Sequence, residues 1–306
     1  MINTAIVVGY GSIGKRHVSI LEKLGLNVII VSRRELNKKN HYSRLDEAIQ
    51  RYPGAYIVIA DETARHADTL GNINTSEHKG PILVEKPLFH SSSVSNDIKE
   101  MDVCVGYVLR FHPLIKLLRS RLKGKRIDVV EVVAGQYLPT WRPDRDYRDS
   151  YSSSRNRGGG VVRDLSHEID LMLWLLGPWL RISATLGKSG SLEIDTEDFC
   201  QVLVEGEEFK TAILSINYLD RIPRRSITIQ CDTGTISLDF IKGTLRENKE
   251  IIGHMLPNKD ELYRYQHEAI LKGNKNDLCS SREGIDVVYI CEKIELAAAS
   301  GSWKTI

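Results

Sequence analysis

A glycine pattern near the start of the chain constrains the fold more than any other feature. A short apolar run, Ala5 to Val8, leads into G-x-G-x-x-G at residues 9–14, and a helical pattern continues to Leu24. In this strand–turn–helix context, glycines let the backbone approach a pyrophosphate, which the helix N-terminus attracts through its free N–H groups. The alternative is a glycine-rich turn with no ligand. We expect a dinucleotide site formed by Gly9, Gly11, Ser12, Ile13 and Gly14.

Short apolar runs alternate with helical segments through the first third of the chain. The runs lie at residues 28–31, 55–60 and 82–84, and a polar helical segment around Thr63 to Leu70 separates two of them. This alternation is typical of a parallel sheet with crossover helices. We therefore predict a Rossmann domain over residues 1–118.

The pattern changes beyond about Leu118. Longer apolar runs follow at residues 127–133, 212–218, 227–231 and 236–240, with few helices between them. The last two alternate in polarity around Asp232-Thr233-Gly234, which predicts a hairpin turn. A chain of 306 residues exceeds the usual size of one domain. We expect residues 119–306 to form a C-terminal α+β domain with a mostly antiparallel open sheet, and the whole chain to be α/β.

Charge and composition exclude several classes of function. Lys and Arg total 42 against 40 for Asp and Glu, a net charge of +2, which favours neither nucleic acid nor a membrane as a partner. No apolar run approaches the roughly 20 residues that cross a bilayer, and the N-terminus does not resemble a signal peptide. The five cysteines are scattered without zinc-site spacing. We expect a cytoplasmic protein with reduced thiols and no metal site.

The end of the second apolar run bears on cofactor choice. An NAD-specific fold usually places an acidic residue there for the ribose 2′-hydroxyl, whereas this chain has Ser32, Arg33 and Arg34. A hydroxyl and two guanidinium groups suit a 2′-phosphate, because Arg pairs with phosphate through a fork of donors. The pattern favours NADP, and NAD stays possible because Glu35 is close in sequence.

Further motifs follow in a fixed order along the chain. They are I-V-I-A at residues 57–60 with His66 after it, E-K-P at 85–87, G-Y-V-L-R-F at 106–111, and G-G-G at 158–160 leading to D-L-S-H-E-I-D at 164–170. In this order, with the opening glycine turn, the chain resembles the glucose-fructose oxidoreductase, inositol dehydrogenase and rhizopine catabolism family (Gfo/Idh/MocA). The resemblance implies an NAD(P)-dependent dehydrogenase or reductase acting on CH–OH groups.

The resemblance assigns a role to E-K-P. In the family the lysine contacts substrate hydroxyls beside the nicotinamide and the proline follows a cis bond, which implies these roles for Lys86 and Pro87. Lys86 is thus a candidate catalytic residue that also contacts cofactor and substrate, and Glu85 a candidate cofactor contact. A Lys partly removed from water can donate a proton or polarise an oxygen. The alternative is a surface Lys-Pro turn.

The segment 164–176 reads as a helix with an apolar stripe formed by Leu165, Ile169, Met172 and Leu176. Asp164 and His167 share another face and are candidate catalytic and substrate-binding residues. The family usually spaces this pair four apart, and here the spacing is three, which leaves Asp164 the weaker candidate. The implied reaction is hydride transfer, with His167 exchanging the hydroxyl proton and Lys86 stabilising oxygen charge, or with these roles exchanged.

Aromatic and arginine residues precede this helix. Sugars stack on aromatic rings, and arginines bind carboxylates or phosphates. We expect a sugar, sugar acid or nucleotide sugar, and the stretch resembles that of relatives associated with surface-glycan and sialic-acid-like sugar synthesis. Nearby aspartates allow an ordinary salt-bridged loop instead. The candidate substrate contacts here are Tyr137, Trp141, Arg142 and Arg148, together with Arg110 from the family motif.

Two other functions stay open. Some proteins of this fold are glycosidases that use NAD transiently, and a retained fold can also bind NADP for regulation without turnover.

Family members commonly associate through the open face of the C-terminal sheet, so the resemblance also implies a homodimer or homotetramer.

Overall fold

The computed structural model describes residues 2–306 and divides them into two compact units. The first unit comprises the chain up to Phe111 together with Asn258–Val288, and the second comprises His112–Pro257 and Tyr289–Ile306. The α/β class is confirmed. The predicted boundary at 118 differs from this division, because the chain leaves the first unit at Phe111 and later returns to it.

A seven-stranded sheet forms the centre of the first unit, in the order β15-β6-β5-β4-β1-β2-β3. All neighbours are parallel except β15, which runs antiparallel to β6. The predicted Rossmann sheet is confirmed, with one edge strand supplied by the distant C-terminal segment. The strands are β1 (Thr4–Val8), β2 (Asn27–Val31), β3 (His41–Tyr42), β4 (Tyr56–Ile59), β5 (Ile82–Val84), β6 (Cys104–Val105) and β15 (Cys279–Ser280).

Helices cover this sheet because its strands are apolar along their length and need burial on both faces. Ala5, Val7 and Val28 pack in one apolar core with Leu21 of α1 and Ile270 of α8, so these two helices cover one face. The helices of the first unit are α1 (Ser12–Lys23), α2 (Leu45–Arg51), α3 (His66–Asn74), α4 (Asn96–Lys99) and α8 (Lys259–Leu271), with the short turns η1 (Thr63–Arg65) and η2 (Val108–Phe111).

The second unit contains a nine-stranded sheet in the order β14-β13-β12-β11-β7-β10-β9-β8-β16. Its neighbours are antiparallel except β7 and β10, which confirms the mostly antiparallel sheet. The predicted hairpin is present, since Cys231 pairs with Gly234 across Asp232 and Thr233. The strands are β7 (Ile127–Gly135), β8 (Trp179–Gly187), β9 (Phe199–Gly206), β10 (Phe209–Asn217), β11 (Arg224–Cys231), β12 (Gly234–Asp239), β13 (Thr244–Glu247), β14 (Glu250–His254) and β16 (Lys304–Thr305).

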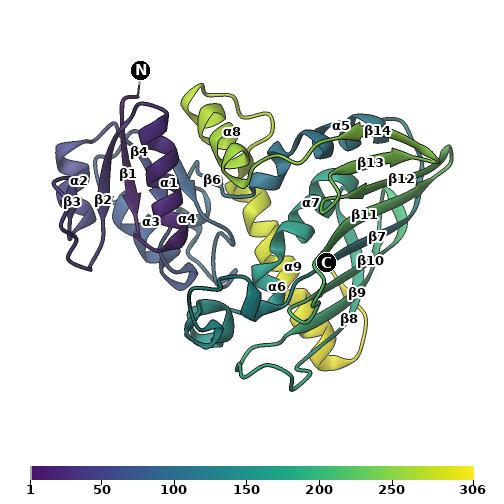
Figure 1. Cartoon of the computed structure of the whole chain (residues 1–306). Helices are drawn as coiled ribbons and strands as arrows, with labels where there is room; N and C mark the ends of the chain where they lie inside the picture. The colour runs from purple at the N-terminus through teal and green to yellow at the C-terminus, as the bar shows by residue number, and fades with distance from the viewer. Residues whose placement is uncertain (1) are drawn as a thin grey trace. The chain divides into compact units, whose positions relative to one another are not determined.

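Helices lie on one face of the second sheet, as Figure 1 shows for α5, α6 and α7. On its strands, buried and exposed residues alternate, which is the pattern of a sheet with one open face. Leu203 and Ile213 are direct cross-strand partners and are 40 % and 44 % exposed. The helices are α5 (Pro113–Leu122), α6 (Val161–Asp164), α7 (Ser166–Leu176) and the last part of α9 (Ser281–Ser300), with the short turns η3 (Leu138–Thr140), η4 (Tyr147–Asp149), η5 (Tyr151–Ser153) and η6 (Arg155–Arg157).

Within residues 2–306, no helix combines the length and apolar character that a membrane crossing requires.

Candidate active site

The glycine turn between β1 and α1 has the shape that a pyrophosphate needs. Gly9 has φ +95°, and a Cβ there would lie 2.6 Å from the Ala60 carbonyl oxygen. A Cβ on Gly14 would lie 2.0 Å from the Gly9 carbonyl oxygen, whereas a Cβ on Gly11 would meet no atom within 4 Å. Gly9 and Gly14 therefore serve close packing, and Gly11 leaves an open backbone face at the start of α1. This cradle fits a dinucleotide, with Ser12 and Ile13 beginning the helix.

The end of β2 lies beside this turn. The Gly9 N–H donates to the Val31 carbonyl at 2.9 Å, which ties the turn to the residues that precede Ser32. The Ser32 hydroxyl accepts the Arg34 N–H at 3.2 Å, and the side chains of Arg33 and Arg34 are exposed. Three polar residues predicted to contact the adenosine ribose thus follow the strand next to the glycine turn.

Two lysines add positive charge around the turn. The ammonium groups of Lys15 and Lys38 lie 5.5 Å and 5.2 Å from the centroid of the Tyr10 ring. A hydrogen bond with Tyr10 raises the pKa of Lys38, so this ammonium stays charged at neutral pH. Their charge favours an anion at the turn. Neither lysine was predicted as a site residue, since neither belongs to the glycine motif.

Glu85, Lys86 and Pro87 follow the carboxyl end of β5. The Lys86–Pro87 bond is cis, as the family resemblance implies. Glu85 is buried at 7 % exposure, and Lys86 is half-buried. Glu85 Oε2 accepts the backbone N–H of Lys86 at 3.2 Å, so the carboxylate fixes the backbone from which the lysine side chain leaves.

The predicted cofactor residues of the first unit share one edge of its sheet. Strands β1, β2, β4 and β5 are parallel, so the glycine turn, Ser32 and Lys86 all follow carboxyl ends of strands. In open α/β sheets ligands bind at this edge. The first unit therefore brings together the residues predicted to bind the dinucleotide.

Arg110 does not fit the predicted role of a substrate contact. Its side chain is 1 % exposed, and Nη1 donates to Glu283 Oε1 at 2.7 Å and to the Leu278 carbonyl at 3.4 Å. A guanidinium buried in this way holds the returning segment 258–288 to the first unit. Family position alone suggested a substrate contact, and the ion-pair partner lies 173 residues away in sequence.

Asp164 and His167 lie in the second unit, on two separate short helices. The predicted continuous helix over 164–176 is wrong, because α6 ends at Asp164 and α7 begins at Ser166, with Leu165 between them at φ −97° and ψ 27°. Ile169, Met172 and Leu176 are buried as the stripe predicted, and Leu165 is half-buried. The predicted pair is thus set on a bend rather than on one helix face.

Two tyrosines surround the Asp164 carboxylate. The Tyr218 hydroxyl donates to Asp164 Oδ2 at 2.6 Å, and Asp164 itself is 4 % exposed. Burial, and then the Asp164 charge, raise the pKa of Tyr218 and of Tyr151 well above the usual value, so both phenols keep their protons. Asp164 is therefore a fixed acceptor for phenol donors. Tyr218 was not predicted as a site residue, because in the sequence it ends an ordinary strand pattern.

The aromatic candidates connect to this cluster. The Trp141 indole N–H donates to the Gln136 carbonyl at 3.1 Å, and its ring meets the edge of Tyr218 at 5.2 Å between centroids. The Tyr137 ring lies 3.6 Å below the Arg221 guanidinium. Trp141 is thus placed next to the residue that holds Asp164, and Arg221 joins the set as a cation that the predicted stretch did not include.

The candidate arginines are partly neutralised. Arg148 pairs with Asp146 and, at 3.1 Å, with Glu193, and these hydrogen bonds raise its pKa further. The Arg142 guanidinium lies 5.9 Å from the centre of the Tyr151 ring. Arg148 thus has the salt-bridged surroundings that the alternative interpretation required. Substrate contact by Arg142 stays a prediction.

Lys86 belongs to the first unit and His167 to the second. Their joint action on one substrate stays a prediction.

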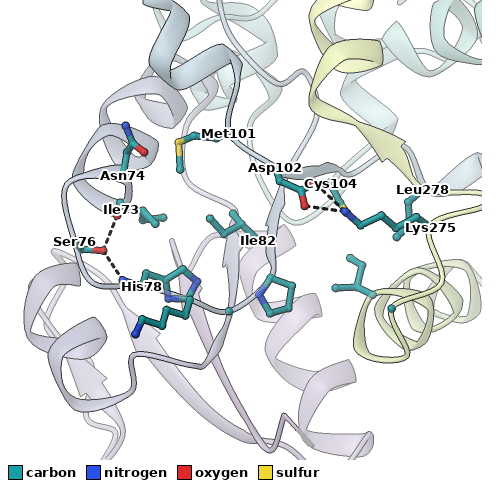
Figure 2. A pocket seen from close by; sticks show the side chains of 15 residues that line it. Ile73, Asn74, Ser76, His78, Ile82, Met101, Asp102, Cys104, Lys275 and Leu278 are labelled. Carbon is teal, nitrogen blue, oxygen red and sulfur yellow. Dashed lines mark hydrogen bonds and ion pairs between the residues drawn. The ribbon is translucent and has the colours of Figure 1, made fainter.

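A separate pocket lies at the amino ends of the strands of the first sheet, opposite the carboxyl ends where the glycine turn and Lys86 lie. This pocket of about 440 Å³ lies where β5 and β6 begin, and Figure 2 shows Ile82, His78 and Cys104 around it. The Lys275 ammonium is bound to Asp102 at 2.7 Å, and burial raises the pKa of the Cys104 thiol to about 11. The pocket contains none of the predicted site residues and provides no thiolate nucleophile.

Comparisons with known proteins give one matching family model and a set of solved structures with a similar fold. The sequence profile of the GFO/IDH/MocA C-terminal domain matches residues 115–237. No curated protein sequence matches the chain significantly.

Solved structures show the same fold. A levoglucosan dehydrogenase in complex with NADH and L-sorbose is 16 % identical, with a TM-score of 0.84 over 99 % of this chain and 98 % of that one. GenD2 from gentamicin A biosynthesis in complex with NAD is 20 % identical, with a TM-score of 0.82 over 100 % and 96 %. The WlbA dehydrogenase from Bordetella pertussis in complex with NADH and UDP-GlcNAcA is 18 % identical, with a TM-score of 0.80 over 100 % and 99 %.

Proposed function

We propose that this chain, a member of the Gfo/Idh/MocA family by its residues 115–237, is a nicotinamide-dependent oxidoreductase acting on a sugar-like hydroxyl or carbonyl. One observation carries the proposal. The open backbone face at Gly11 and the half-buried Lys86 both follow carboxyl ends of parallel strands in the first unit. A dinucleotide on the glycine turn has Lys86 at the same sheet edge.

The residues of the chain divide the chemistry among them. A nicotinamide dinucleotide held at the glycine turn of Gly9, Gly11 and Gly14 would supply a hydride donor or acceptor. Lys86, on its fixed backbone, polarises the substrate oxygen or exchanges its proton, and His167 takes the other of these roles. Asp164 accepts a hydrogen bond from the buried Tyr218 phenol, so its contribution is to hold Tyr218 in place.

The proposed cofactor is NADP, with NAD as the alternative. Arg33 and Arg34 are exposed and follow β2, where a ribose 2′-phosphate would lie. NAD or NADH is bound in the three related structures named above, so NAD is kept as the alternative for this chain.

The proposed substrate class is a sugar, sugar acid or nucleotide sugar, as in surface-glycan or sialic-acid-like sugar synthesis. Two aromatic residues, Trp141 and Tyr137, together with the Arg142 guanidinium beside Tyr151, suit a sugar ring that carries negative charge. Of the related structures, the levoglucosan dehydrogenase holds the sugar L-sorbose, and WlbA holds the nucleotide sugar UDP-GlcNAcA.

The test is a turnover screen of the full chain. NADPH, NADH and their oxidised forms are combined with sugar acids, amino sugars and nucleotide sugars, and the absorbance of reduced nicotinamide is followed. Lys86→Ala should lower kcat about 10²- to 10⁴-fold, the range for loss of a general acid or base. Lys79→Ala is the matched control, because Lys79 is exposed near the opposite end of β5.

The outcomes separate the candidate functions. Stoichiometric change of the cofactor supports the oxidoreductase. Sugar cleavage without net cofactor change indicates the glycosidase. Tight NADPH binding with no turnover across the panel indicates a regulatory protein, and equal activity of Lys86→Ala and wild type would remove the proposed mechanism.

We also propose that the chain forms a homodimer or homotetramer through the open face of the second sheet. The exposed pair Leu203 and Ile213 gives this face an apolar centre.

A further inference from the structure

Four buried side chains of the first unit form a continuous hydrogen-bonded chain. Tyr56 Oη lies 2.9 Å from His267 Nδ1, His267 Nε2 lies 2.9 Å from His17 Nδ1, and His17 Nε2 lies 2.9 Å from Glu85 Oε1. Tyr56, His17 and His267 are 0 % exposed, and Glu85 is 7 % exposed. The histidines come from α1 and α8, 250 residues apart in sequence. The returning segment 258–288 thus completes this chain of groups.

The three hydrogen bonds that link these four side chains form only when each bond has one donor and one acceptor. Burial, and then the neighbouring His17, lower the pKa of His267 far below its usual value, so this imidazole is neutral, with one donor and one acceptor nitrogen. Burial raises the pKa of Tyr56 well above its usual value, so its hydroxyl can donate. The Glu85 carboxylate accepts. The ring hydrogen bonds allow two opposite directions. In the direction that starts at the Tyr56 hydroxyl, Tyr56 donates to His267 Nδ1, His267 Nε2–H donates to His17 Nδ1, and His17 Nε2–H donates to Glu85.

Aromatic packing keeps water away from the two imidazoles. The edge of Tyr263 meets the His17 ring at 5.3 Å between centroids, and the Arg16 guanidinium lies 5.4 Å from the Tyr263 ring centre. The His267 ring meets the Tyr56 ring edge-on at 5.6 Å. In such surroundings hydrogen bonds are strong and an unpaired partner is costly.

The chain ends on the carboxylate that fixes Lys86. Glu85 Oε1 receives His17, and Oε2 receives the Lys86 N–H at 3.2 Å. On a third side is Gly106, where a Cβ would lie 3.0 Å from the Glu85 carboxyl carbon. The position of Glu85 is therefore set by groups that come from outside its own strand.

We propose that Tyr56, His267 and His17 form a one-directional relay that orients the Glu85 carboxylate, so that His17 and His267 are positioning residues for Lys86. The relay acts at a distance from substrate and touches neither hydride donor nor acceptor. Its effect on turnover rests on the proposed function, whereas its proton arrangement does not.

The proton arrangement is tested by nitrogen-15 NMR of the histidines in the full chain. We expect His17 and His267 each to carry a ring proton on Nε2 and none on Nδ1. Tyr56→Phe keeps the ring and removes the donor, so it should shift the His267 Nδ1 resonance most. An Nδ1–H tautomer at either histidine, or no shift in Tyr56→Phe, would overturn the relay.

The positioning role is tested by a pair of variants at His17. His17→Leu removes the donor to Glu85, and His17→Gln restores an N–H near Nε2. We expect Leu to lower kcat about tenfold with little change in the KM of the dinucleotide, and Gln to recover a large part of it. A role in packing alone predicts equal kcat for Leu and Gln, and that result would overturn the positioning role.

Wild-type turnover separates the two proposals. If wild type is inactive toward every substrate while the tautomers are as expected, the proposed function fails and the relay stands. If wild type is active while His17→Leu and His267→Phe keep its kcat, the positioning role fails and the proposed function stands.

Discussion

At the scale of single residues, the three glycines of the first turn have different tasks. A methyl group on Gly14 collides with backbone at 2.0 Å, whereas one on Gly11 meets nothing within 4 Å and its φ of −76° suits alanine. Gly11→Ala should therefore leave Tm nearly unchanged and weaken dinucleotide binding about tenfold or more, ~1.4 kcal/mol. Calorimetric titration and thermal melting measure both.

Gly14→Ala is the matched variant for this prediction. It should lower Tm as well as affinity, because rigid backbone cannot yield to the new carbon, at a cost of about 1–3 kcal/mol. A Gly11→Ala variant with full affinity would contradict a ligand at this turn.

The arginines after β2 give a second prediction at this scale. Arg33 and Arg34 are exposed, so their removal should cost little stability. The double variant Arg33→Ala with Arg34→Ala should weaken NADPH binding about tenfold or more and leave NADH binding within twofold, since only NADPH carries the 2′-phosphate. Equal losses for both cofactors would argue for a general charge effect and against NADP preference.

At the scale of elements, helix α5 has an N-cap that depends on pH. The buried His112 ring accepts the Leu114 N–H through Nδ1 at 3.2 Å, and burial, then Arg225, lower the pKa of His112 to about 4. The unfolded chain binds this proton near the ordinary value of 6.5, so it holds more protons than the folded chain between these values. The contribution of the neutral His112 to the free energy of unfolding is therefore fully present above about pH 6.5 and is lost as pH falls toward 4.

His112→Asn tests this cap, because an amide oxygen accepts the same N–H without titrating. Chemical denaturation at a series of pH values should show a shallower acid slope, by up to roughly 2–3 kcal/mol between neutral pH and pH 4. If the variant and wild type lose stability equally as pH falls, His112 does not contribute to the loss of stability in acid.

Elements with local signals were predictable, and those with distant partners were not. The run from Ala5 to Val8 is flanked by its own glycine turn, and the hairpin at Asp232 by its own turn residues, so both appear where expected. The break at Leu165 was missed, because helical spacing continues through it while the backbone does not. Strand β15 has only two residues, and its partner β6 lies far away in sequence.

At the scale of the whole molecule, the first unit is assembled from two separate stretches. His267 and Glu283 reach His17 and Arg110 across most of the sequence, and no local pattern indicates such pairs. This explains why motifs predicted the glycine turn and E-K-P, while the hydrogen bonds that reach Glu85 through His17 and the burial of Arg110 were not predicted.

The open sheet face gives a prediction at this scale. Ile213 is 44 % exposed in the centre of that face, so Ile213→Lys should leave folding intact and place a charge in any apolar interface. We expect light scattering to give a dimer or tetramer for wild type and a smaller species for the variant. Identical masses for the two proteins would contradict an interface through this face of the sheet.

The central claim is that Lys86 and His167 act on the same transition state. It is tested most directly by kcat/KM of Lys86→Ala, His167→Ala and the double variant, on the substrate identified by the screen. When two groups act as a unit, the effects of removing them are strongly non-additive. The double variant should therefore be nearly as active as the less active of the two single variants. Losses that simply multiply, or a His167→Ala variant as active as wild type, would contradict the account.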